Sequence, residues 1–302
     1  MTERQDDLSK RLEWRPWQPL RESWLDDHLP SMPGLSRIRR VGRTDIDYIG
    51  ETGSGDTPLK TRISMLRGVY REQMPDRYPH TAGPALWALR DATGCDFEVS
   101  VAPVLGPTSW RKGLKCVAIG LYRQEHGASP TVNFGRMPIG YRMPTMSKGN
   151  NPKLTASGKR FRGGPTAVTD DSHVASIAPF GPLSGDPQSP SWCGHVWSSW
   201  HSLSGLSKHL SVYVTGLYRI RRPGMESLLY IGRGRIRMGV DTHKHKVIKP
   251  DEQQAEVISG ALECSWTLND SWYFHQRLEL VNDLIAAYVL TTGAVPDTQF
   301  NG

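Results

Sequence analysis

The feature of this sequence that most constrains its fold is a short pattern that occurs twice. The first copy runs from Gly34 to Gly50 and the second from Gly216 to Gly232. Each begins with Gly-Leu-X-Arg-Ile-Arg-Arg and ends in Tyr-Ile-Gly. The offset is 182 residues, both from 34 to 216 and from 48 to 230. So many matches at one offset indicate a duplicated unit.

Each copy has the pattern of a β-hairpin. In the first strand apolar residues are interspersed with basic ones, a glycine (Gly42 or Gly224) supplies the turn, and a second strand ends in Tyr-Ile-Gly. These strand segments resemble the two for which the GIY-YIG nuclease superfamily is named. The second copy has Gly-Leu-Tyr, whereas the first has Gly-Leu-Ser and lacks the first tyrosine at Ser36.

The residues after the first hairpin predict a small unit of mixed structure. A helix is expected after Pro58, with Arg62 at the edge of its apolar face, where a cleft can form. A second helix is expected over 82–90, a strand over 97–101 and a third helix over 112–126.

The later part of the second copy is recognisable too. Residues 280–288 match 114–122 at an offset of 166, from 122 to 288. The fold class is therefore expected to be α/β, with two GIY-YIG-like units. Each would be a short, twisted, mainly antiparallel sheet flanked by helices. Four parts are predicted: a tryptophan-rich leader over 1–33, a first unit over 34–134, a connector over 135–211 and a second unit over 212–302.

The leader and the connector allow two interpretations each. The leader is either a strap packed on the first unit or an arm that binds a partner. Residues 136–162 of the connector hold seven basic residues and no acidic one. This composition fits contact with nucleic-acid phosphates, and a solvated linker is the alternative. The basic residues are Arg136, Arg142, Lys148, Lys153, Lys159, Arg160 and Arg162.

The resemblance implies a set of catalytic residues. The family uses two hairpin tyrosines, an arginine on the following helix, a glutamate that holds a divalent metal ion, and an asparagine. By this resemblance, the candidate catalytic residues are Tyr48, Arg62 and Asn133 in the first copy and Tyr218 and Tyr230 in the second. Each also has a structural alternative, as a strand aromatic, a surface arginine or a turn residue.

Both copies depart from the family pattern. The departing positions are Ser36 and Lys115 in the first copy and Gly239, Val281 and Gln299 in the second. Lys115 and Val281 stand where the metal-binding glutamate is expected. Since a hard Mg²⁺ ion is normally held by at least one carboxylate, the metal ligands are unknown.

Three functional hypotheses follow. The first is a DNA endonuclease that hydrolyses phosphodiester bonds with Mg²⁺ or Mn²⁺, in restriction or defence against foreign DNA. The second is a catalytically degenerate protein that binds nucleic acid on the same scaffold. The third is a site assembled from Tyr218 of one copy and Arg62 of the other.

Composition agrees with a nucleic-acid partner without requiring one. The net charge is +7 at pH 7 and the pI about 9.3, which favours anionic partners. Hydrophobic residues make up 37%, and no run approaches the roughly 20 apolar residues of a membrane span. The first residues are polar and the four cysteines are scattered without a Cys-X-X-Cys pair. A cytoplasmic protein with free thiols and no membrane partner is expected.

Overall fold

The computed structural model describes residues 12–24, 29–53, 55, 57–145, 161–241 and 260–300. Its Cα positions form two compact units. Of the described residues, the amino-terminal unit contains those within 12–111 and 129–175, and the carboxy-terminal unit contains those within 112–128 and 176–300. Among the described residues, no helix is long and apolar enough to cross a membrane.

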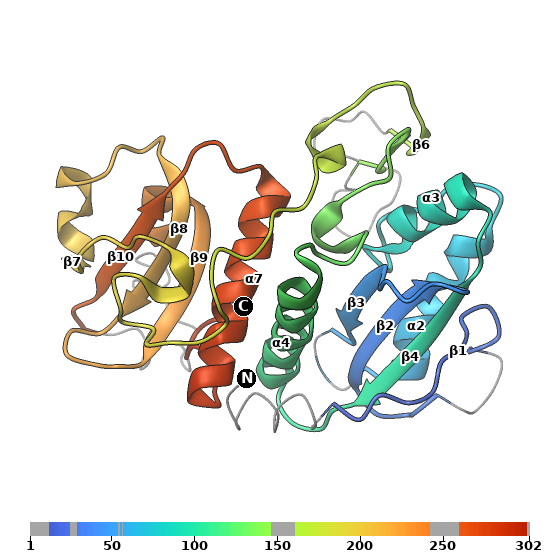
Figure 1. Ribbon diagram of the computed structural model, residues 1–302, viewed down its shortest axis with the longest axis horizontal. Helices are drawn as coiled ribbons and strands as arrows, with labels where there is room; N and C mark the ends of the chain where they lie inside the picture. The colour runs from blue at the N-terminus through green and yellow to red at the C-terminus, as the bar shows by residue number, and fades with distance from the viewer. Residues whose placement is uncertain are drawn as a thin grey trace. The chain divides into compact units, whose positions relative to one another are not determined.

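The amino-terminal unit is built on a four-stranded antiparallel sheet (Figure 1). The strand order is β1 (Gln18–Pro19), β4 (Phe97–Pro103), β2 (Gly34–Arg40) and β3 (Tyr48–Glu51). The β2–β3 pair confirms the first predicted hairpin. Gly42 lies in its turn at φ 76°, a left-handed value that glycine adopts without steric cost.

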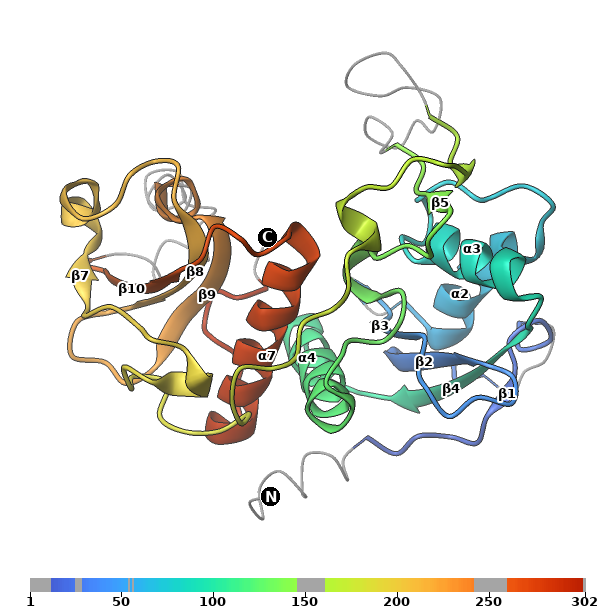
Figure 2. The same ribbon diagram turned by 45° about the horizontal axis from the view of Figure 1, so that its top comes forward.

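Helices lie over one face of this sheet (Figures 1 and 2). Leu59 and Ile63, from the predicted apolar stripe, are fully buried in the core beneath them, with Ile38, Val99 and Val101 of the sheet. The helical elements are α2 (Leu59–Ser64), η1 (Met65–Tyr70) and α3 (Gly83–Thr93). Short elements complete the unit: η2 (Asn133–Gly135), β5 (Tyr141–Arg142), β6 (Gly164–Pro165) and η3 (Asp171–His173).

The carboxy-terminal unit repeats the same sheet. Its strands follow the order β7 (His201–Ser202), β10 (Glu263–Leu268), β8 (Thr215–Arg221) and β9 (Leu228–Arg235), all antiparallel. This order matches β1-β4-β2-β3 strand for strand, which the duplication predicts. The fold is therefore mixed α/β, with two small antiparallel sheets and flanking helices, as expected. The other elements are η4 (Trp192–Gly194), η5 (Leu203–Lys208), a helical segment over 236–241 and α7 (Phe274–Thr292).

The tryptophan-rich leader packs on the sheet of its own unit. The guanidinium carbon of Arg37 lies 4.6 Å from the ring centroid of Trp14 and 4.7 Å from that of Trp17. The hydroxyl of Ser100 donates to the carbonyl of Arg15 at 2.6 Å. These contacts stabilise the strap by cation–π attraction and by a hydrogen bond to its backbone.

The second unit uses the same arrangement. Arg219 lies 4.4 Å from the ring of Trp197 and 4.9 Å from that of Trp200, and the hydroxyl of Ser265 donates to the carbonyl of Ser198 at 2.8 Å. Trp14 and Trp17 correspond to Trp197 and Trp200 at an offset of 183. The repeat therefore begins at these tryptophans, and the predicted boundaries at 34 and 212 lie inside the repeat rather than at its start.

The helix predicted over 112–126 is α4 (Thr108–His126), and most of it lies outside the unit in which the sequence places it. From Lys112 onward it belongs to the carboxy-terminal unit, where it packs against its sequence counterpart, α7. A Cβ on Gly120 would lie 2.8 Å from that of Ala286, so glycine is needed for this close approach. Gly113 faces Val289 and Arg123 faces Glu279, which makes the two helices antiparallel.

A buried ion cluster joins these helices. The Nε of Arg123 donates to Asp283 at 2.8 Å and its Nη2 donates at 3.0 Å, while its Nη1 lies 3.5 Å from Glu279. Two carboxylates thus share one guanidinium. Burial raises the pKa of Asp283 to about 6; Arg123 opposes the rise and Glu279 adds to it.

We expect the neutral form of Asp283 to stabilise the fold at low pH. Its folded pKa lies above the usual 3.8, so this contribution is present below pH 3.8 and lost as pH rises through 6. The loss amounts to about 3 kcal/mol. Asp283→Asn removes the titration. Between pH 4 and 8, the free energy of unfolding of the wild type should therefore fall relative to that of the variant.

Urea unfolding at each pH measures the difference. Buried His80 and His195, whose pKa values are lowered to about 3 and about 4, titrate in both proteins and cancel. Glu125→Gln on the exposed side of α4 is the control, and its curve should parallel that of the wild type. Parallel curves for Asp283→Asn would contradict the expectation.

Candidate functional site

In the amino-terminal unit, the structure brings Tyr48 and Arg62 together. Tyr48 is the first residue of β3 and its ring lies over Gly50, where a Cβ would be only 2.5 Å away. Arg62, in the last turn of α2, lies close enough to Tyr48 to act on it electrostatically. Burial raises the pKa of Tyr48, Arg62 opposes that rise, and Glu51 adds to it. The site therefore holds a protonated phenol against a guanidinium.

His80 is the residue of this site that sequence reasoning missed. Its ring lies 5.6 Å from that of Tyr48 in an edge-on arrangement, and it is 2% exposed. Its Nδ1 accepts from the backbone NH of Ala82 at 3.3 Å. Burial and the nearby Arg62 lower its pKa to about 3, so it is neutral at physiological pH. It lies in a loop without periodicity, which leaves no signal in the sequence.

The position of the missing first tyrosine is a buried one. Ser36 lies opposite Gly50 in the β2–β3 register and is 3% exposed. Its counterpart, Tyr218, lies opposite Gly232. A Cβ on Gly232 would overlap the ring of Tyr218, whereas one on Gly50 would overlap the ring of Tyr48. The same glycine therefore makes room for a different tyrosine in each unit.

Asn133 connects the end of its repeat to β3. Its Oδ1 accepts from the backbone NH of Ile49 at 2.9 Å, and its Nδ2 donates to the carbonyl of Ile49 at 2.9 Å. Gln299 makes the same pair with Ile231, at 2.8 and 3.0 Å. In both units the side-chain amide takes the place of a neighbouring strand.

Backbone bonds beside these amides repeat as well. The NH of Val132 donates to the carbonyl of Asp47, and the NH of Thr298 to that of Leu229, both at 2.9 Å. The offsets are 166 and 182, the same as for the sequence matches. Asn133 and Gln299 thus occupy equivalent places, as the sequence indicated, and both carboxamides are engaged by backbone.

The two tyrosines of the second copy, Tyr218 and Tyr230, lie in the carboxy-terminal unit. The rings of Tyr218 and Tyr230 are 6.0 Å apart, and burial raises the pKa of both. Gly239, at the expected arginine position, lies beneath the hydroxyl of Tyr218, since a Cβ there would be 2.5 Å away. An arginine at 239 would collide with this tyrosine.

Arg233 supplies the positive charge in this unit, and the sequence analysis did not single it out. It corresponds to Glu51 at the offset of 182, so the charge at this position is reversed between the copies. Its guanidinium carbon lies 4.3 Å from the ring centroid of Phe274. Burial lowers the pKa of Arg233, as does Arg277, while Tyr230 opposes this.

The donor sets differ in their fit to a divalent metal ion. Val281 is buried, and the neighbouring Glu279 and Asp283 are held by Arg123. The charged groups that act on Tyr218 and Tyr230 are cationic or thiol, so this site does not fit Mg²⁺. Near Tyr48 one carboxylate is present, Glu51, whose Oε2 accepts from the NH of Gly53 at 2.5 Å. Over the described ranges, no three His, Cys, Asp or Glu side chains group as metal ligands do.

The remaining predicted residues are dispersed. Lys115 is half-buried on α4 in the carboxy-terminal unit, whereas Tyr48 and Arg62 belong to the other. Arg136 is half-buried, Arg142 lies 3.8 Å from Asp170, and Arg162 donates to Gln73 at 2.9 Å. Four of the predicted basic residues lie outside the described residues: Lys148, Lys153, Lys159 and Arg160.

Comparison with known proteins gave no match: no family model, no curated protein and no solved structure matches this chain. The GIY-YIG resemblance therefore remains a prediction from the two hairpin motifs.

The amide of Asn133 should be structural. Asn133→Ala leaves the buried NH and carbonyl of Ile49 without partners, so we expect the unfolding free energy to fall by about 2 kcal/mol. Gln299→Ala should cost about as much. Gln73→Ala, which removes one exposed hydrogen bond, is the control and should change stability by less than about 0.5 kcal/mol. Denaturant unfolding measures all three, and an unchanged midpoint for Asn133→Ala would contradict this role.

Proposed function

We propose that this chain binds nucleic acid, with DNA as the expected partner, through phosphate contacts at the two tyrosine sites. One observation carries the proposal: in each unit an arginine lies beside the tyrosine of Tyr-Ile-Gly. Arg62 has this place beside Tyr48, and Arg233 has it beside Tyr230. The two arginines come from different positions of the repeat. Both sites therefore have a positive charge beside the tyrosine, although different positions supply it.

The electrostatics of the second site support an anionic ligand. Burial and the charge of Arg277 both lower the pKa of Arg233, and among the described residues its guanidinium has no hydrogen-bond acceptor. A phosphate between or beside such guanidinium groups relieves their repulsion and accepts charge-assisted hydrogen bonds. The phenol groups of Tyr218 and Tyr230 supply further donors.

Removing Arg233 should weaken DNA binding and reduce its dependence on salt. For Arg233→Ala we expect the slope of log K against log salt concentration to become shallower by about 0.9 per lost phosphate contact. Fluorescence anisotropy with a labelled duplex over a range of salt concentrations gives the slope. Lys208→Ala, which removes an exposed charge on η5, is the control. Equal slopes for Arg233→Ala and wild type would contradict the proposal.

A second candidate is DNA hydrolysis in the amino-terminal unit. The proximity of Arg62 to Tyr48 favours it, because this pair places a phenol and a fixed positive charge at one point. An arginine there would stabilise the charge that develops on the scissile phosphate. Glu51 is the residue that would hold a divalent metal ion, which supplies Lewis-acid stabilisation when bound.

Plasmid cleavage with Mg²⁺ or Mn²⁺ tests this candidate. If the protein cleaves DNA, Arg62→Ala should lower the rate by about 10²- to 10³-fold, since one charge-stabilising donor is removed. Arg43→Ala in the β2–β3 turn is the control for general loss of charge. Full activity of Arg62→Ala, with an unchanged circular dichroism spectrum, would remove Arg62 from the mechanism. Absence of cleavage by the wild type with either metal would leave binding as the function.

A further inference from the structure

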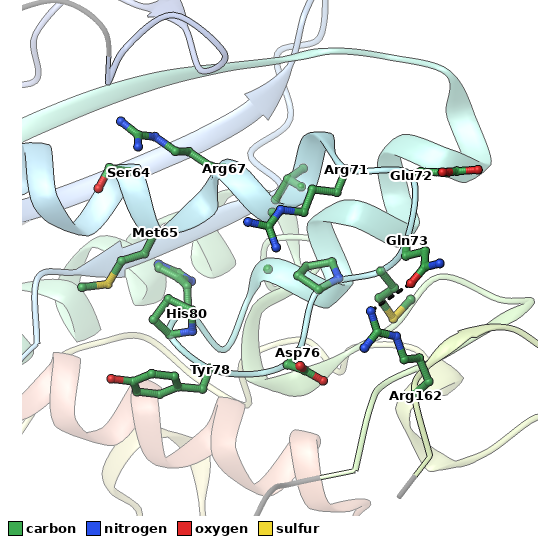
Figure 3. Close-up of a pocket in the computed structure, with 16 residues that line it drawn as sticks. Ser64, Met65, Arg67, Arg71, Glu72, Gln73, Asp76, Tyr78, His80 and Arg162 are labelled. Atoms are coloured by element: carbon green, nitrogen blue, oxygen red, sulfur yellow. Dashed lines mark hydrogen bonds between the residues drawn. The ribbon is translucent and has the colours of Figure 1, made fainter. Parts of the chain in front are cut away.

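A cavity of about 560 Å³ lies next to the Tyr48–Arg62 pair within the amino-terminal unit (Figure 3). Its lining comes from η1, from the loop that leads to α3, and from Arg162. His80 lines the cavity and also packs on the ring of Tyr48. Arg62 donates to the carbonyl of Pro79, another lining residue, at 3.3 Å. The cavity and the tyrosine site therefore share a wall.

Three arginines line this cavity: Arg67, Arg71 and Arg162. The guanidinium carbon of Arg67 lies 5.8 Å from the ring centroid of Trp24, which leaves Arg71 and Arg162 to bind a ligand. Arg71 is exposed, and among the described residues its guanidinium has no hydrogen-bond acceptor. Arg162 donates from one nitrogen to Gln73, at 2.9 Å. In Figure 3 the side chains of Arg71 and Arg162 lie around the same space, whereas Glu72 points away from it. Two such guanidinium groups fit a phosphate, which takes several charge-assisted hydrogen bonds.

The rest of the lining suits a flat, partly polar group. Tyr78 is 62% exposed and faces the cavity with Met65 and Pro79 beside it. An exposed aromatic ring of this kind stacks on a nucleobase. Asp76 also lines the cavity, and a carboxylate can accept hydrogen bonds from the amino groups of a base. His80 is neutral and adds no charge.

We propose that this cavity holds one nucleotide of an unpaired strand. Its phosphate binds Arg71 and Arg162, and its base stacks on Tyr78 within reach of Asp76. The volume falls within the range of about 300–1,000 Å³ typical of small-molecule pockets. This inference rests on the proposed function, since it names the form of nucleic acid that the chain binds. A base inside a duplex is not accessible to such a pocket, so unpaired DNA is the preferred ligand.

Isothermal titration with deoxynucleoside 5′-monophosphates tests the cavity directly. The four mononucleotides are compared with deoxyribose 5-phosphate and inorganic phosphate, using the full chain. Mononucleotides should bind at least about fivefold more tightly than either, because stacking contributes about 1–3 kcal/mol, which is roughly 5- to 150-fold. Arg71→Ala should weaken mononucleotide and phosphate binding together, by about tenfold or more. Tyr78→Ala should weaken only the mononucleotides, and Tyr78→Phe should restore them.

A second titration separates this inference from the proposed function. Anisotropy compares a duplex that contains a short unpaired bubble with the fully paired duplex. The bubble should bind more tightly, and Tyr78→Ala should remove that preference while the paired duplex still binds. Arg43→Ala, an exposed arginine outside the cavity, is the matched control for Arg71→Ala.

The outcomes are distinct. If paired DNA binds but mononucleotides do not, or bind equally well to Arg71→Ala and Tyr78→Ala, the nucleotide cavity is overturned and the proposed function stands. If mononucleotides bind as predicted but neither DNA binds, the cavity is supported and the proposed function fails. Equal affinity for phosphate and mononucleotides shows an anion site without base recognition, which also overturns the inference.

Discussion

The side-chain amide that closes each repeat is the interaction on which both tyrosine sites depend. β3 and β9 are edge strands, and an edge strand exposes backbone donors and acceptors that need partners. Asn133 and Gln299 satisfy one NH and one carbonyl of Ile49 and Ile231, next to the tyrosine in each case. Because the amide bonds the NH and the carbonyl of one isoleucine at once, the segment that closes the repeat cannot shift along the strand. The position of the tyrosine is therefore fixed by a residue that lies 84 or 68 positions from the isoleucine it binds.

On this common frame, the charges of the two copies have diverged. The position after Tyr-Ile-Gly is acidic in one copy and basic in the other, and the helix position is arginine in one and glycine in the other. The two changes offset each other. Gly239 carries no charge where the first copy has Arg62, and Arg233 supplies a positive charge to the second site from the strand instead. An arginine at 239 would meet Tyr218. Retention of Tyr218 thus excludes the arginine that the GIY-YIG resemblance implies at position 239, and favours a cation carried by the strand.

The sequence predicted the helices and strands better than it predicted which residues contact one another. The hairpins, the helices after them and the equivalence of Asn133 with Gln299 follow from local pattern and constant offsets. The leader's membership of the repeat was missed, since Trp14 and Arg37 meet through a cation–π contact that has no periodicity. The sequence also did not predict that α4 belongs to the carboxy-terminal unit from Lys112 onward. Its apolar face predicts burial but does not specify that Gly120 fits against Ala286. His80 and Arg233 act through spatial neighbours, which single-residue patterns do not encode.

The missing first tyrosine illustrates why single positions of this scaffold are not independent. In the carboxy-terminal unit, the ring of Tyr218 fills the space over Gly232, and in the amino-terminal unit the ring of Tyr48 fills the corresponding space over Gly50. Ser36 is small and buried, which leaves that space to Tyr48 and allows it to reach Arg62. A tyrosine at 36 would compete for the same volume, and close-packed interiors do not absorb a whole ring. Ser36 and the Tyr48–Arg62 pair therefore depend on each other, and a tyrosine introduced at position 36 would require Tyr48 to move away from Arg62.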